Sequence, residues 1–336
     1  MRGVTGTVLV TGASGFVGGH LVERLASEGT RIRALMRPGR ESEIVRNAGA
    51  EIVVGDLSDP GSLERAVTGV GAVIHLAALK HSTSQAAYVR VNKHGTERLA
   101  DAIRRVRGDR AIRVVYLSSY AAAGPSEPDR ARTVTDPTTP VSRYGASKLH
   151  GEACMLALAR DGVPVVVVRA PVVYGPRDTD LLTFFRFVRR GWAPLPPGHE
   201  RRLHLVFAAD LARALARAAG TGDRSVPPGV YAVADPIAHT WPVVYAAMAA
   251  ALGTQVRLVR IPAPLMRVAA LASEAGGVLS GRAVLFSRDK AKEMFASGWV
   301  CDVSGSESML PPECVTAIEA GMAQTVKWYR DQRWLS

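Results

Sequence analysis

The stretch VLVTGASGFVGGHLVERL, residues 8–25, places three glycines at G-x-x-G-x-x-G spacing between an apolar run and an amphipathic segment. In a strand-turn-helix unit, Gly12 would make the tight turn, and Gly15 would let backbone N–H groups approach a pyrophosphate. Gly18 would let the helix pack closely on the strand, while the helix N-terminus faces the negative charge. The stretch therefore predicts a dinucleotide-binding unit at the start of the chain.

Short apolar runs alternate with amphipathic segments through the first half of the chain. The strand-like runs are TVLVTG (7–12), TRIRALMR (30–37), AEIVVGD (50–56), GAVIHLAA (71–78), IRVVYLSS (112–119) and VPVVVVRA (163–170). The helix-like segments cover residues 17–28, 41–48, 60–67, 86–106 and 143–160. Strict alternation indicates right-handed βαβ crossovers, so we expect an α/β fold with a Rossmann-type, doubly wound parallel sheet.

After Ala170 this rhythm breaks, and proline and glycine become more frequent. We therefore expect a dinucleotide-binding Rossmann domain over residues 1–170, with later elements from about 203–235 completing its sheet. Residues 171–336 would form most of a smaller, mixed substrate-binding lobe that is interleaved with this sheet. Within that part, Asp210 is expected to cap a helix.

The chain has 42 Lys and Arg against 30 Asp and Glu, a net charge of +12, and only six of the basic residues are lysines. They are scattered singly through helix-like segments without interleaved aromatic residues, so we expect no nucleic-acid binding. Two explanations of the arginine excess stay open. It reflects either a compositional habit or the attraction of an anionic cofactor or substrate.

The three cysteines have neither the pairing nor the spacing of a disulfide framework or a zinc site. We expect no metal, a reducing compartment and, because no signal pattern precedes the first strand, a cytoplasmic location. The apolar segment 261–286 is interrupted by Arg267, Glu274 and Arg282, and it falls short of the roughly 20 apolar residues that a span needs. A substrate-covering helix and peripheral membrane contact remain alternatives for it.

The ends of the second and third strand-like runs bear on the cofactor. Met36 occupies the position where NAD-preferring folds usually carry an acidic residue, and Arg37 follows it. Arginine binds a 2′-phosphate, so NADP is favoured over NAD, with Arg40 as a second contributor and a merely exposed arginine as the alternative. Asp56 would accept a hydrogen bond from the adenine amino group. The alternative is a turn or helix-capping role, which suits Asp59 better.

The segment SRYGASKLHGE (142–152) sets Tyr144 four residues ahead of Lys148, on one face of a helix. The pKa of a free phenol is about 10, so acid-base catalysis by tyrosine at neutral pH requires a stabilised phenolate. A nearby ammonium and an oxidised nicotinamide would supply this stabilisation. Ser119 is the candidate partner of the reacting carbonyl, and Ser118 would support the loop. A plain turn at the end of the strand is the alternative.

These motifs, together with VNKHGT and RAPVVYGPRD, resemble the extended short-chain dehydrogenase/reductases of the NAD-dependent epimerase/dehydratase family. The resemblance implies a catalytic triad of Ser119, Tyr144 and Lys148, a proton passed by Tyr144 during hydride transfer, and a homodimer. Lys148 would also hold the nicotinamide ribose. The implied cofactor contacts are Gly12, Ser14, Gly15, Phe16, Val17, Gly18, Arg37, Asp56, Leu57, Ala77, Ala78, Tyr144 and Lys148.

Within the family, nucleotide-sugar epimerases usually carry asparagine at the position of Val172. The chain is more similar to the 3β-hydroxysteroid dehydrogenase-like and dihydroflavonol-reductase-like branch. That branch implies an NAD(P)(H)-dependent oxidoreductase that interconverts a secondary alcohol and a ketone on a fairly apolar, steroid-like, polyketide or other secondary-metabolite scaffold. A nucleotide-sugar epimerase or dehydratase with tightly bound NAD is the alternative.

Overall fold

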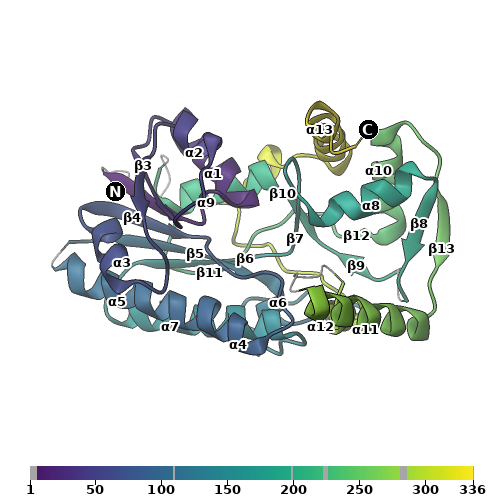
Figure 1. Ribbon diagram of the computed structural model, residues 1–336, viewed down its shortest axis with the longest axis horizontal. Helices are drawn as coiled ribbons and strands as arrows, with labels where there is room; N and C mark the ends of the chain where they lie inside the picture. The colour runs from purple at the N-terminus through teal and green to yellow at the C-terminus, as the bar shows by residue number, and fades with distance from the viewer. Residues whose placement is uncertain (1–5, 109, 198–199, 222–225, 281–285, 336) are drawn as a thin grey trace.

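Seven parallel strands form the main sheet of the computed structural model, which describes residues 6–108, 110–197, 200–221, 226–280 and 286–335 (Figure 1). The strand order across the sheet is β11, β6, β5, β4, β1, β2, β3. Their bounds are β1 (Thr7–Thr11), β2 (Ile32–Met36), β3 (Glu51–Val54), β4 (Val70–His75), β5 (Arg113–Ser119), β6 (Val165–Ala170) and β11 (Gly229–Ala232). The chain winds outward from β1 in both directions, which confirms the predicted fold class.

Helices cover both faces of this sheet, as a parallel sheet requires. One face packs against α1 (Phe16–Ser27), α2 (Glu43–Asn47) and α9 (Ala208–Ala219). The other face packs against α3 (Pro60–Val67), α5 (Thr96–Arg107) and α7 (Arg143–Arg160), which run below the sheet in Figure 1. Because both faces are covered, the middle residues of the central strands are apolar. Val8, Leu9 and Val10 of β1 are fully buried.

The connection between β4 and α5 differs from the single helix expected over residues 86–106. A short α4 (Gln85–Tyr88) leads into a π-helical turn, η1 (Val89–Gly95), before α5 begins. The wider turn directs Asn92 inward, where its side chain is 1% exposed. Its amide oxygen accepts from Leu79 N–H (2.7 Å) and its amide nitrogen donates to Leu79 O (2.9 Å). Insertions of this kind in helices are frequent at functional sites.

The C-terminal lobe has its own apolar core around Phe185, Tyr245 and Tyr329. Its helices are α8 (Asp180–Arg189), α10 (Trp241–Leu252), α11 (Ala263–Ser280), α12 (Arg288–Phe295) and α13 (Ile318–Asp331), with short η2 (Pro312–Cys314). Its strands form pairs: β7 (Val172–Tyr174) with β10 (Leu205–Phe207), β8 (Trp192–Leu195) with β13 (Arg257–Arg260), and β9 (Arg202–Leu203) with β12 (His239–Thr240). The short helix α6 (Tyr120–Ala123) follows β5 and lies between the two parts (Figure 1).

Two late segments return to the sheet domain. Strand β11 pairs with β6, and α9 packs on the sheet face, whereas β10 pairs with β7 outside the main sheet. The expectation that Asp210 caps a helix is wrong. Asp210 lies inside the first turn of α9, whose N-cap is Phe207, and its carboxylate accepts from Thr316 N–H (2.7 Å) and pairs with Arg213 (3.3 Å). It therefore ties α9 to the chain before α13.

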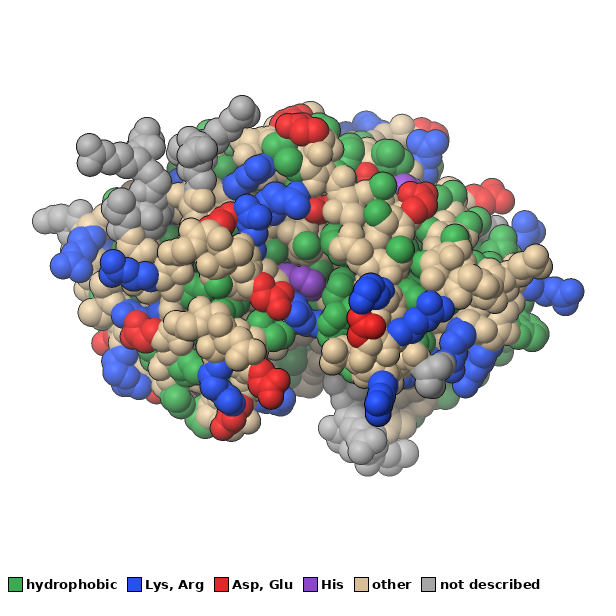
Figure 2. Space-filling model, turned by 90° about the horizontal axis from the view of Figure 1, so that it is seen from above, with side chains coloured by type: hydrophobic (Ala, Val, Ile, Leu, Met, Phe, Trp, Pro, Cys, Tyr) green, Lys and Arg blue, Asp and Glu red, His purple; other side chains and the backbone are tan. Residues whose placement is uncertain are grey.

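Among the described residues, no helix combines the length and apolar character that a membrane span requires. Of the segment 261–286, residues 281–285 lie outside the described part. Helix α11 leaves Leu265, Val268 and Leu271 about half exposed, at 57%, 61% and 49%. On the face seen in Figure 2, Lys and Arg side chains are spread out and mixed with acidic ones.

Candidate active site

The turn between β1 and α1 has the backbone geometry that a diphosphate needs. Gly12 has φ +76°, and a Cβ built on it would lie 2.8 Å from Ala77 N. A Cβ on Gly18 would lie 2.1 Å from Gly12 O, so any side chain there would collide with the turn. Gly15 is the N-cap of α1, and no side chain caps the helix. The uncapped helix start and the close approach to Ala77 fit a dinucleotide.

The other predicted cofactor residues differ in how far their side chains are exposed. Ser14 and Ala78 are exposed, while Phe16, Val17 and Ala77 are half-buried. Leu57 is only 9% exposed and packs in the core beneath α5, so its side chain has a structural role.

Asp56 and Arg37 lie at the ends of neighbouring strands, as expected. The Asp56 carboxylate accepts from Ser58 N–H (2.8 Å) and Ser58 Oγ (2.7 Å), which forms a tight turn. Partial burial raises the pKa of Asp56, but the bonds from Ser58 and the charges of Arg37 and Arg98 outweigh it, so the pKa is lowered. Arg37 is exposed. Asp59 is the N-cap of α3 and accepts from Gly61 N–H (3.0 Å).

The three predicted catalytic residues come together where β5 ends. Ser119 is the last residue of β5 and caps α6 by accepting from Ala121 N–H (3.2 Å), while its hydroxyl is also a hydrogen-bond partner of the Tyr144 phenol. Lys148 follows one turn further along α7, and its side chain is 2% exposed. The structure therefore places the Tyr-Lys pair on one helix and the serine beside the tyrosine.

Lys148 is held by groups of β5. Its Nζ donates to Leu117 O (2.7 Å) and lies 4.3 Å from the centre of the Tyr116 ring. Burial lowers the pKa of Lys148 to about 7, although the Glu152 carboxylate acts to raise it. Nearby His75 is fully buried, and burial together with the Lys148 charge lowers its pKa to about 3, so the imidazole is neutral.

The protein's own groups raise the pKa of Tyr144, so the expected stabilisation of its phenolate by an ammonium together with an oxidised nicotinamide stays a prediction. Burial raises the pKa of Tyr144 to about 12, and the Glu293 carboxylate adds to the rise. The hydrogen bond from Ser119 and the charge of Lys290 act in the opposite direction but do not outweigh these effects. The phenol therefore carries its proton at neutral pH, the state that a general acid requires.

A buried ion pair behind Lys148 was missed by the sequence reasoning. Glu152 accepts from Arg169 through both carboxylate oxygens (3.0 and 2.8 Å), and the Ser118 hydroxyl donates to it (2.5 Å). Both partners are less than 5% exposed. Ser118 thus bonds to α7, whereas its expected support of the loop after β5 stays a prediction. Two features of the sequence could have indicated this ion pair: the arginine in the otherwise apolar run VVVVRA, and the glutamate four residues after Lys148.

Asn92 was also not singled out. Its amide nitrogen donates to Ser147 Oγ (2.8 Å), and the Ser147 hydroxyl donates to Tyr144 O (2.7 Å). This chain of bonds links the loop after β4 to the catalytic helix. The only signal was the position of Asn92 in VNKHGT, within a stretch that otherwise reads as one amphipathic helix.

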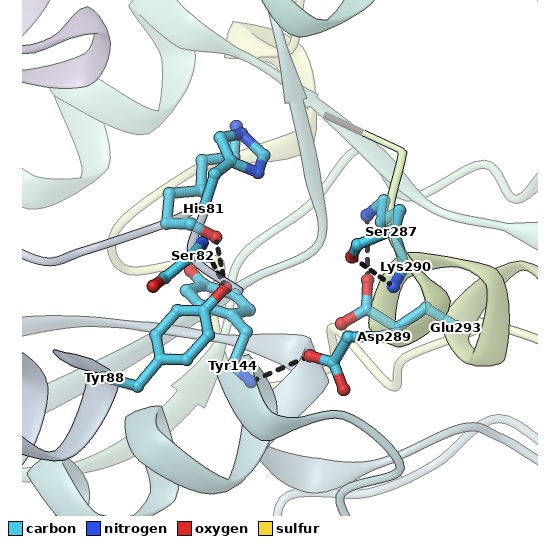
Figure 3. Close-up of a pocket in the computed structure, with 9 residues that line it drawn as sticks. His81, Ser82, Tyr88, Tyr144, Ser287, Asp289, Lys290 and Glu293 are labelled. Atoms are coloured by element: carbon cyan, nitrogen blue, oxygen red, sulfur yellow. Dashed lines mark hydrogen bonds and ion pairs between the residues drawn. The ribbon is translucent and has the colours of Figure 1, made fainter. Parts of the chain in front are cut away.

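A cavity of about 40 Å³ lies beside Tyr144. Its walls come from the loop after β4, from α4 and α7, and from α12 of the C-terminal lobe (Figure 3). Four of the lining side chains are paired: Lys80 and His81 with Asp180, and Lys290 with Glu293. From above, the molecule is hollowed between its two halves, and a histidine is visible in the hollow (Figure 2). The described residues hold no cluster of three or more metal-ligating side chains.

The chain is similar in sequence and in structure to known proteins. The chain is 30% identical to the ceramide reductase of Caulobacter vibrioides over 334 residues, which cover 98% of this chain and 96% of the relative. The crystal structure of gox2253 superposes with a TM-score of 0.79 at 23% identity, covering 99% of this chain and 100% of that one.

The structure of MoeE5 in complex with UDP-glucose and NAD superposes with a TM-score of 0.75 at 25% identity, covering 98% and 100% of the two chains. The dinucleotide cofactor bound in this neighbour is NAD, so the comparison does not support the preference for NADP that Arg37 suggested. Residues 8–234 match the NAD dependent epimerase/dehydratase family. This protein belongs to the NAD-dependent epimerase/dehydratase family of enzymes with a Rossmann fold.

Proposed function

We propose that this enzyme is an NAD(P)(H)-dependent oxidoreductase that interconverts a secondary alcohol and a ketone on a fairly apolar small molecule. The observation that carries the proposal is the meeting of Ser119 and Tyr144 at the end of β5, with Lys148 one turn away on α7. Full-length similarity to a ceramide reductase supports a reductase acting on an apolar substrate. The scaffold, whether steroid-like, polyketide or another secondary metabolite, stays within this proposal.

In the direction of reduction, Tyr144 gives its proton to the carbonyl oxygen, and the Ser119 hydroxyl holds that oxygen by a hydrogen bond. A nicotinamide, when bound, would supply the hydride for the carbonyl carbon. Lys148 holds the nicotinamide ribose and offers its positive charge when Tyr144 becomes a phenolate. The residues of the glycine turn, Gly12, Gly15 and Gly18, let the backbone approach the diphosphate.

The test is a nicotinamide absorbance assay of the purified protein against a panel of ketones. Tyr144→Phe removes the proton donor while leaving the ring, so turnover is expected to fall by about 10²- to 10⁴-fold. Cofactor affinity, measured by titration, should stay within about twofold because the phenol does not form the glycine turn. Normal turnover by this variant would refute the proposed mechanism.

A nucleotide-sugar epimerase or dehydratase is the second candidate, and the similarity to MoeE5 with UDP-glucose and NAD favours it. An epimerase regenerates its cofactor in each cycle, so NAD retained through purification and protection from heating by a UDP-sugar would support it. Release of the cofactor together with net ketone reduction would support the oxidoreductase. A thermal-shift comparison of NAD with NADP settles the choice of nucleotide.

We also propose a homodimer and a cytoplasmic location. A groove along α5 and α7, where we place the contact between the two copies, is lined by the small residues Ala100, Ala153 and Ala157 and by polar and charged ones, among them Glu97 and Arg104. Cys154, Cys301 and Cys314 are free thiols, as expected in a reducing compartment. Light scattering of the purified protein measures its mass in solution and tests the dimer.

A further inference from the structure

The first turn of the catalytic helix α7 depends on a distant part of the chain. The first hydrogen bond within α7 runs from Ala146 N–H to Ser142 O. The N–H groups of Arg143, Tyr144 and Gly145 come before Ala146 and therefore need partners outside the helix backbone. Gly145 N–H donates to the capping Ser142 Oγ (2.9 Å). Arg143 N–H donates to Asp289 Oδ1 (2.8 Å), and Tyr144 N–H donates to Asp289 Oδ2 (3.3 Å). One carboxylate of α12 therefore satisfies two of the three groups.

A second carboxylate of α12 holds the cap itself. Glu293 Oε1 accepts from Ser142 Oγ (2.7 Å), and Glu293 Oε2 accepts from Lys290 Nζ (2.8 Å). Other helix starts are served locally: Asp59 caps α3, and Asp178 accepts from Asp180 N–H (2.9 Å) at the start of α8. The start of α7 is thus built from two lobes, while these two helices need only their own loops.

Helix α12 also closes the space in front of Tyr144. Figure 3 shows Asp289, Lys290 and Glu293 of α12 facing Tyr144 and Tyr88 across the pocket, with Asp289 bonded to the Tyr144 backbone. The cavity of about 40 Å³ has room for about one or two water molecules, whereas small-molecule pockets measure roughly 300 Å³ or more. In this position α12 forms one wall of the space beside Tyr144, and an outward movement of α12 would break its contacts with α7.

We propose that α12 is a positioning element for the catalytic helix, in which Asp289 and Glu293 hold the first turn of α7 so that the C-terminal lobe controls when Tyr144 is fixed for proton transfer. The inference rests on the proposed function for the reaction, but the contacts themselves do not. Both are positioning residues, because each acts through the backbone or the cap of α7. A movement of α12 away from α7 would release this capping.

The charges around the phenol give Glu293 a second effect. The groups that face Tyr144 are Tyr88 of α4, Lys80 and His81 of the loop after β4, Asp180 of α8, Ser119 of β5, and Asp289, Lys290 and Glu293 of α12. Among their charges, Glu293 contributes most to the raised pKa of Tyr144. Glu293→Gln should therefore lower the pKa at which Tyr144 loses its proton.

The first experiment compares Asp289→Ala with Asp59→Ala, a matched control that removes a helix-capping carboxylate far from the site. Hydrogen exchange, read by mass spectrometry, is expected to be about tenfold faster at residues 143–145 in Asp289→Ala only. In the ketone assay, kcat should fall about tenfold for Asp289→Ala, with cofactor affinity unchanged within about twofold. Asp289→Asn keeps one acceptor oxygen and should recover part of the loss.

The second experiment records the pH dependence of kcat for ketone reduction. Reduction needs a protonated Tyr144, so kcat falls as pH rises through the pKa of Tyr144 in the complex with cofactor and ketone, and Glu293→Gln should move this fall to lower pH. Unchanged exchange at residues 143–145 and unchanged kcat in Asp289→Ala would overturn the proposal. Absence of ketone turnover by the wild-type enzyme would instead refute the proposed function, while the exchange measurement would still decide on α12.

Discussion

The first and third turns of α7 are held in place by different parts of the chain. The third turn carries Glu152, which is bonded to Ser118 of β5 and Arg169 of β6, 34 and 17 residues away in the sequence. The first turn carries Tyr144, which is bonded through its backbone to Asp289 of α12, 145 residues away. The sheet domain therefore fixes the lysine end of the site, and the C-terminal lobe completes the tyrosine end. This difference suggests that the two ends respond differently to substitution.

The largest expected effect is at the end that the sheet domain fixes. Lys148→Met removes the ammonium that we propose to hold the nicotinamide ribose and to stabilise the phenolate, so kcat/KM should fall by about 10²- to 10⁴-fold. Cofactor affinity, measured by titration calorimetry, should weaken as well, in contrast to Tyr144→Phe. A variant that keeps kcat/KM within about tenfold of the wild-type value would contradict the role given to Lys148.

Next in size is the loss of the buried ion pair. Glu152→Gln leaves the Arg169 guanidinium buried without its counter-charge, which should lower the free energy of unfolding by about 3–5 kcal/mol. Urea unfolding of the variant measures this. Changing both partners, Glu152→Leu with Arg169→Met, should cost less than the single change, because no charge is left unpaired. A single variant as stable as the wild type would show that the pair does not anchor the third turn.

Glu152 also affects how activity depends on pH, because its carboxylate raises the pKa of Lys148. The pKa of Lys148 lies at about 7, so its ammonium is present below that pH and is lost as the pH rises through it. In the free enzyme, kcat/KM for the nicotinamide cofactor should therefore decline above about pH 7. Because Glu152 raises the pKa of Lys148, Glu152→Gln should move the decline to lower pH. A profile that is identical in both proteins would separate Glu152 from the titration of Lys148.

The smallest effect concerns the cap of the first turn. Ser142→Ala removes the acceptor of Gly145 N–H and the donor to Glu293, and should cost about 1–2 kcal/mol of unfolding free energy. Ser42→Ala at the start of α2 is the matched control, because among the described residues the Ser42 hydroxyl accepts a single long hydrogen bond, from Val45 N–H (3.5 Å). Thermal unfolding of both variants tests the difference. Equal losses would mean that the contact with α12 adds nothing to the cap.

The strands and most helices could be predicted because their signals are local. The bounds of α3 and α7 coincide with the predicted segments 60–67 and 143–160, since a proline and a serine mark their starts. The helix expected over residues 86–106 runs without a break from Gln85 to Arg107, but the π-helical turn within it, where Asn92 bonds to the backbone of Leu79, is not revealed by a periodic pattern. Asp210 was misassigned for a similar reason, since its partner Thr316 lies 106 residues away.

The sequence by itself determined the alternation of strands and helices, the glycine turn, and the placement of Tyr144 and Lys148 on one helix face. Each of these depends on residues a few positions apart, where backbone geometry and side-chain periodicity decide the outcome. Only the tertiary structure decided that Arg169 would neutralise Glu152, that Asp289 would cap α7, and that the pKa of Tyr144 would rise. Burial and charge pairing depend on which distant segments meet, and the packing of the two lobes sets those meetings.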